Sequence, residues 1–181
     1  MERLTLGRLG LWVYTAGIFA WIFPNIGEGE YANAVTDVVI VLFGLLAAMG
    51  LPRAVDGIGT GLLRWGLSGI LFGQFMQNAI ASATDWNTFS AAPRLVVMAG
   101  AVLMAIGVKK WQEDEWDHQA TPWLALGFAG FACEPLYYQV IGVATGSFFG
   151  PYALGALLVL AGSALAAWAF RPARDHEPSE A

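Results

Sequence analysis

The sequence predicts an all-α polytopic membrane bundle of six transmembrane helices arranged as three antiparallel hairpins. The first observation behind this prediction is composition. The hydrophobic fraction is 57% and the mean hydropathy is +0.56, whereas charged residues make up only 13% of the chain. Soluble domains carry about 25% charged residues. The second observation is six apolar stretches, each close to the ~20 residues that a helix needs to cross a bilayer. The third is the one-sided distribution of lysine and arginine around these stretches.

The six expected helices follow one another with short connections. Each is rich in Gly, Ala and Ser, as is typical of helices that pack closely in lipid. Three pairs form hairpins at about 8–51, 62–110 and 122–170, within one transmembrane domain of residues 1–171. Residues 172–181 are acidic and small, and we expect a disordered cytoplasmic tail there. The individual helices are expected at 8–24, 33–51, 62–83, 92–110, 122–144 and 150–170.

The orientation follows from the nine basic residues. Only Arg94 falls on the side of the three short connections between the helices of each hairpin. Basic residues collect in cytoplasmic segments of membrane proteins. We therefore expect a multi-pass protein of the cell membrane with both termini in the cytoplasm. The other eight basic residues lie on the predicted cytoplasmic side: Arg3, Arg8, Arg53, Arg64, Lys109, Lys110, Arg171 and Arg174.

The three hairpins align with one another at a period of roughly 60 residues. Gly17, Gly69 and Gly130 occupy equivalent positions in the first helix of each hairpin. In the second helices, residues 37–44 align with residues 94–101. The sequence therefore predicts three tandem repeats of a helical hairpin.

Two segments of the first hairpin resemble a known family. Gly-Ile-Phe-Ala-Trp-Ile-Phe-Pro at 17–24, followed by Asp-Val-Val-Ile-Val-Leu-Phe-Gly at 37–44, is similar to the SPW-repeat membrane proteins, although Phe23 and Asn25 replace the Ser and Trp of their motif. That resemblance implies a two-helix repeat and no established activity. In architecture the predicted fold also resembles urea and amide channels, and Leu-Phe-Gly at 71–73 is similar to a short string in those channels.

Glu134 is the first candidate for a functional residue. It lies near the middle of the fifth predicted span, directly before Pro135. A carboxylate at that depth costs at least ~2.5 kcal/mol, so we expect it to be buried in protein, paired or protonated. A functional reading is a site for a proton or a cation. A structural reading is a neutral carboxyl that is hydrogen-bonded to an amide of the third span and holds the bundle in register.

Polar amides form a second group of candidates. Gln74, Gln77 and Asn78 share one face of the third predicted helix, because they are spaced at i, i+3 and i+4. The repeat alignment places Gln139 near the same level. Together with Glu134 these residues predict a polar vestibule for small neutral or cationic solutes. Hydrogen bonding between helices is the alternative, worth about 0.6 kcal/mol per contact in lipid.

Asp37 and Arg94 hold equivalent repeat positions near the outer membrane boundary. We expect a structural ion pair between them that ties the first two hairpins together. At the boundary, Arg94 is expected to lie too far out to pair with Glu134.

Several classes of function are excluded or lack a motif. The chain has one cysteine and two histidines, and both histidines fall in polar segments, so no haem held by paired histidines and no multi-cysteine metal site is expected. No enzymatic motif is present, and we predict no enzyme activity, cofactor, metal or nucleic-acid partner. The bilayer is the expected partner, with a homo-oligomer or a larger membrane complex as a further expectation. The sequence favours permeation or transport of a small solute, ion or proton near Glu134. The alternative is a structural or accessory subunit without transport activity.

Overall fold

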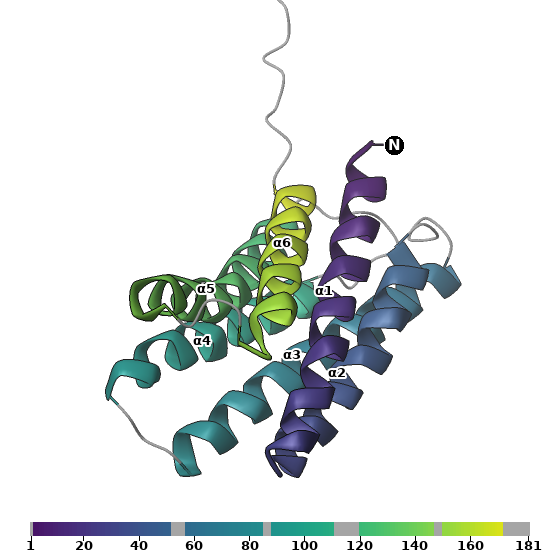
Figure 1. Cartoon of the computed structure of the whole chain (residues 1–181). Coiled ribbons are helices and arrows are strands. Elements are labelled where there is room, and N and C mark those ends of the chain that lie inside the picture. Colours follow the sequence, from purple (N-terminus) through teal and green to yellow (C-terminus); the bar gives the residue numbers. More distant parts are fainter. Residues whose placement is uncertain (1, 52–56, 85–87, 111–119, 147–149, 172–181) are drawn as a thin grey trace, which may run out of the picture.

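The computed structural model describes residues 2–51, 57–84, 88–110, 120–146 and 150–171, and this part of the chain is helical throughout apart from turns. It contains the six predicted helices and no strand (Figure 1). The predicted tail at 172–181 lies outside the described residues. The helices are α1 (Glu2–Gly27), α2 (Tyr31–Gly50), α3 (Gly57–Thr84), α4 (Thr88–Lys110), α5 (Thr121–Thr145) and α6 (Ala153–Phe170).

Five of these helices are long and apolar enough to cross a membrane, namely all except α3. Helix α3 has 28 residues and is long enough, but Arg64 and the amides Gln74, Gln77 and Asn78 lower its hydropathy. The outer surface of the bundle carries large exposed apolar side chains, such as Leu42, Val102 and Leu154. Together these properties suggest an integral membrane protein.

The helices form a closed ring in sequence order. Each helix packs against the next one along the chain, and α6 packs against α1. Figure 1 shows α1 and α6 side by side, with the N-terminus and the end of α6 at the same end of the bundle. We call this the terminal end, and we call the opposite end, where the two helices of each hairpin connect, the hairpin end.

Glycines allow the closest contacts between neighbouring hairpins. A Cβ atom on Gly17 of α1 would lie 2.6 Å from the backbone nitrogen of Val159 in α6. Equivalent crowding occurs where Gly69 of α3 meets Phe43 of α2 and where Gly130 of α5 meets Gly100 of α4. Around the closed ring, each of the three glycines of the predicted repeat thus faces the second helix of a neighbouring hairpin, namely α6, α2 and α4 in turn. The sequence repeat itself stays a prediction.

The interior differs between the two ends of the ring. The terminal half is filled with buried apolar side chains, among them Leu11, Leu67 and Met104. Buried Asn25, Asp37 and Asn78 lie in the hairpin half. The interior is therefore apolar in the terminal half and polar in the hairpin half.

Candidate functional site

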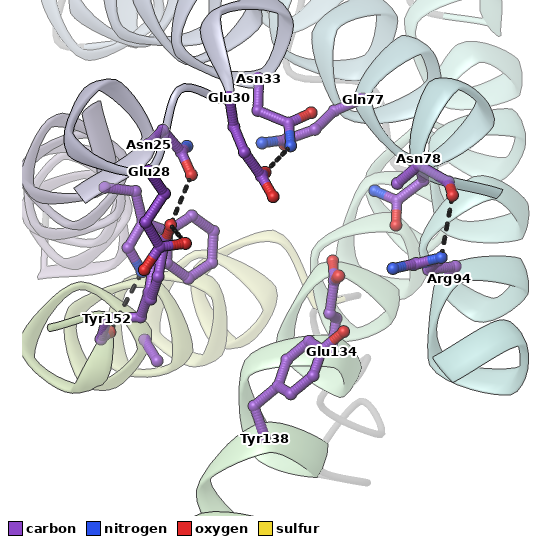
Figure 2. Close-up of a pocket in the computed structure, with 13 residues that line it drawn as sticks. Asn25, Glu28, Glu30, Asn33, Gln77, Asn78, Arg94, Glu134, Tyr138 and Tyr152 are labelled. Atoms are coloured by element: carbon purple, nitrogen blue, oxygen red, sulfur yellow. Dashed lines mark hydrogen bonds between the residues drawn. The ribbon is translucent and has the colours of Figure 1, made fainter. Parts of the chain in front are cut away.

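A pocket of about 360 Å³ lies at the hairpin end, lined by residues from all six described helices, by Glu28 and Glu30 between α1 and α2, and by Tyr152 directly before α6 (Figure 2). Its volume is at the small end of the range for ligand pockets, about 300–1,000 Å³. We call this pocket the vestibule. It contains Glu134, Gln77 and Asn78 from the predicted site, together with Arg94.

Asp37 is the centre of a hydrogen-bonded network beside the vestibule. Its side chain is fully buried on α2. Asn25 of α1 donates to one carboxylate oxygen at 2.6 Å, and Gln77 of α3 donates to the other at 2.9 Å. The carboxylate therefore joins the first three helices at the point where the lining of the vestibule begins.

Tyr152 extends this network to the start of α6. Its hydroxyl lies 3.0 Å from the amide oxygen of Asn25 and 2.9 Å from a carboxylate oxygen of Glu28, and it can donate its proton to either. The backbone oxygen of Tyr152 accepts a hydrogen bond from the indole nitrogen of Trp21 at 3.2 Å. Burial, and then the neighbouring Glu28, raise the pKa of the Tyr152 hydroxyl above its usual value.

Glu134 and Arg94 form another part of the lining. Figure 2 shows the guanidinium of Arg94 beside the carboxylate of Glu134. The positive charge of Arg94 acts on Glu134. Asn78 lines the same pocket, and its amide donates to the backbone oxygen of Gln74 at 2.9 Å. Arg94 also donates to the backbone oxygen of Ala81 at 3.0 Å.

The position of Arg94 corrects an expectation from the sequence. We expected Arg94 to lie too close to the membrane boundary to reach Glu134, but the two residues line the same pocket. The physical reason is that α4 begins at Thr88 and not near residue 92, so Arg94 lies inside the helix and its long side chain reaches the pocket that Glu134 lines. The contacts described above do not include the ion pair between Asp37 and Arg94, which stays a prediction.

Two of the predicted site residues bind elsewhere. Gln74 is buried and donates to the Tyr14 hydroxyl oxygen at 2.7 Å, beneath the vestibule. Gln139 donates to the backbone oxygen of Ala153 at 3.2 Å and so ties α5 to the start of α6. Neither is among the residues that line the pocket. The structure thus brings Glu134, Gln77 and Asn78 together in the lining of the pocket, and it leaves Gln74 and Gln139 outside that lining.

Buried aromatic side chains fill the interior of the bundle on the terminal side of the vestibule, and none of them lines the pocket itself. Tyr14, Phe128 and Phe170 are fully buried, and Phe131 is nearly so. The rings of Tyr14 and Phe128 meet edge to face at 6.2 Å between centroids, and those of Phe128 and Phe170 stack at 5.7 Å. We call Tyr14, Phe128, Phe131 and Phe170 the aromatic floor.

The charged side chains around the vestibule are mostly acidic. Glu28 and Glu30 are exposed at its mouth, and Glu134 lies deeper. Arg94 is the one base among the described residues that line it. Three or more His, Cys, Asp or Glu side chains do not come together as a metal site anywhere in the described part of the chain.

Several residues of the vestibule were not predicted from the sequence, namely Trp21, Glu28, Glu30 and Tyr152. Glu28 and Glu30 belong to the first short connection at the hairpin end, and their position next to Asn25 was a usable signal. Tyr152 follows the last connection directly. Polar residues in connections of a membrane protein are ordinarily solvated, so these positions carried little weight by themselves.

Comparisons of the chain with protein-family models, with curated proteins and with solved structures found no match. The resemblances to SPW-repeat proteins and to urea and amide channels therefore stay predictions.

Proposed function

We propose that this protein binds a small solute or ion in the vestibule and carries it across the membrane. The observation that supports this most strongly is the vestibule itself. A bundle held together only by contacts between helices would be expected to fill its interior, whereas here a pocket lined by Glu134, Arg94 and Gln77 reaches into the bundle from one end.

Transport through the bundle would also require the aromatic floor to open. A solute in the vestibule cannot proceed while Tyr14, Phe128 and Phe170 fill the terminal half. The hydrogen bond from Gln74 to Tyr14 lies between the polar and the apolar halves and links α3 to α1. Transport would require this bond to break and the floor to separate, so the present arrangement corresponds to a state open only at the hairpin end.

The basic residues set the proposed direction. Arg8, Arg64, Lys109 and Arg171 all lie toward the terminal end of their helices. By the positive-inside rule this end faces the cytoplasm. The vestibule would then open to the outside of the cell membrane.

An accessory subunit of a larger membrane complex is the second candidate. It is favoured by the buried apolar side chains that fill the terminal half. It is also favoured by a shallow apolar groove along Gly100, Gly130 and Cys133 on the outer surface of α4 and α5. In that case the vestibule would be a polar joint between helices. A homo-oligomer would use the same kind of outer surface.

Flux measurements distinguish these functions. Purified protein in liposomes should release or take up at least one of protons, potassium, acetamide or choline faster than empty liposomes do. Glu134→Gln should change that rate by about tenfold or more, while Glu180→Gln, the same chemical change near the end of the chain, should not. If none of these solutes crosses and Glu134→Gln has no effect, the transport function is wrong and the accessory role is favoured.

A further inference from the structure

Three aromatic side chains face the vestibule, and two of them are held in place by hydrogen bonds. The indole of Trp21 is fixed through its bond to the backbone oxygen of Tyr152, and the phenol of Tyr152 is fixed through its contacts with Asn25 and Glu28. The third is Tyr138, which is 43% exposed. Held rings of this kind are preorganised, because little side-chain freedom is lost when a ligand arrives.

Gly155 makes room for the indole of Trp21. A Cβ atom at this position of α6 would collide with the indole ring. The lack of a side chain at Gly155 therefore allows Trp21 to lie against α6 while it lines the vestibule. The ring position depends on this close packing as well as on the hydrogen bond to Tyr152.

The charge around these rings favours a cation. When ionised, Glu28, Glu30 and Glu134 contribute three negative charges against the one positive charge of Arg94. The positive charge of Arg94 is close to the carboxylate of Glu134, and its guanidinium donates a hydrogen bond to the backbone oxygen of Ala81. The charge of Arg94 is therefore largely offset by neighbouring groups of the protein. The exposed carboxylates of Glu28 and Glu30 are then the main source of negative electrostatic potential at the mouth of the vestibule.

The spacing of the carboxylates favours an organic cation over a metal ion. A bare divalent ion needs several oxygen ligands within one coordination sphere, and the described part of the chain does not gather three such side chains. An organic ammonium carries a diffuse charge, and it is recognised by aromatic faces together with acidic groups nearby. A pocket of about 360 Å³ also offers more space than a single ion fills.

We propose that the vestibule selects a small organic monocation of the alkylammonium class. The ammonium group lies against Trp21, Tyr138 and Tyr152, and the field of Glu28 and Glu30 draws it in. This inference rests on the proposed function, because it names the substrate class of the same site. Its test measures binding alone and therefore does not depend on transport.

The probe is choline, compared with 3,3-dimethyl-1-butanol, which has the same shape without the charge. Binding to the purified wild-type protein is measured in detergent by calorimetry and by tryptophan fluorescence. Choline should bind at least about tenfold more tightly than the neutral isostere. Its affinity should fall as salt is added, because Glu28 and Glu30 are exposed to solvent.

Variants test the two parts of the site separately. Trp21→Leu should weaken choline binding by about 2- to 30-fold, the range that corresponds to one cation–π contact. Trp65→Leu is the matched control, because this residue is 70% exposed on α3 toward the terminal end, and it should leave binding unchanged. The double variant Glu28→Gln/Glu30→Gln removes charge but keeps oxygen acceptors, and it should remove most of the salt dependence.

Folding of Trp21→Leu is checked by gel filtration, and Tyr138→Leu provides a second aromatic variant if Trp21→Leu does not fold. Equal affinity for choline and its neutral isostere, or unchanged choline binding in both aromatic variants, would overturn the inference. If another solute crosses liposomes in a Glu134-dependent way while choline does not bind, transport stands and the cation class fails. If choline binds selectively and nothing crosses, the cation site stands and the transport function fails.

Discussion

Gly17→Val is predicted to open the ring between α1 and α6. On α1, Gly10 and Gly17 are seven residues apart, and they face Gly162 and Gly155 of the antiparallel α6. A Cβ atom at Gly17 would lie 2.6 Å from the backbone nitrogen of Val159 and 2.8 Å from the backbone oxygen of Gly155. Both contacts are with backbone, which cannot move aside as a side chain can, so the helices must separate.

The expected destabilisation is about 2–3 kcal/mol. Overpacking a close-packed interior costs about 1–3 kcal/mol, and valine adds two γ-carbons to a Cβ that already collides. Valine has a higher helix propensity than glycine, but this difference stabilises the helix by only roughly 0.3–0.5 kcal/mol. In a chain of this size about 1 kcal/mol corresponds to ~2–4 °C in Tm, so the apparent Tm should fall by about 4–12 °C.

Thermal unfolding of the purified protein in detergent, followed by fluorescence-detected gel filtration, measures this shift. The matched control is Gly61→Val, because a Cβ atom on Gly61 of α3 would meet nothing within 4 Å. The control should stay within about 2 °C of the wild type. Equal Tm values for Gly17→Val and Gly61→Val would show that α1 and α6 are not packed through their backbones and that the closed ring is wrong.

Two further predictions concern polar side chains, one pair beneath the vestibule and one residue in its lining. Tyr14→Phe and Gln74→Leu should couple in a double-mutant cycle by about 0.6 kcal/mol and at most ~1.7 kcal/mol, and strictly additive Tm changes would count against the bond at the aromatic floor. Burial and Glu28 raise the pKa of Tyr152, so the folded state favours the neutral hydroxyl. Stability from this group is then complete below about pH 10 and is lost as the pH rises toward the raised pKa. The wild type should therefore lose more Tm between pH 9 and pH 11 than Tyr152→Phe does, and parallel losses would contradict the assignment.

The positions of the helices could be predicted from the sequence, because the hydropathy of a segment reflects whether it contacts lipid or water. Each predicted helix overlaps the helix found, but α1 and α3 extend well beyond the apolar stretches at 8–24 and 62–83. Hydropathy marks the part of a helix that lies in lipid, whereas backbone hydrogen bonding continues through Glu2–Gly27 and Gly57–Thr84. Closure of the ring by α1 and α6 could not be predicted, because contacts distant in sequence depend on the shape of the assembled bundle.

The site was predicted in part for a related reason. Helical spacing placed Gln74, Gln77 and Asn78 on one face, and that is correct for a helix, but it does not fix their depth. Gln74 lies deeper than the vestibule and binds Tyr14, while Gln77 reaches Asp37 one turn further along α3. The reach of Arg94 and the ring positions of Trp21 and Tyr152 depend on side-chain packing across helices, which a pattern along the chain does not contain.

The most direct test of the central claim is the accessibility of single cysteines to a membrane-impermeant maleimide added to intact cells. In a Cys133→Ala background, the reagent should modify Ala81→Cys and Glu134→Cys, since both positions line the vestibule. It should not modify Ser163→Cys, which is fully buried on α6. Modification of the vestibule positions only from the cytoplasmic side would keep the vestibule and reverse its orientation. An unreactive Glu134→Cys from both sides, in a variant that folds, would show a closed interior and contradict the vestibule on which the proposed function depends.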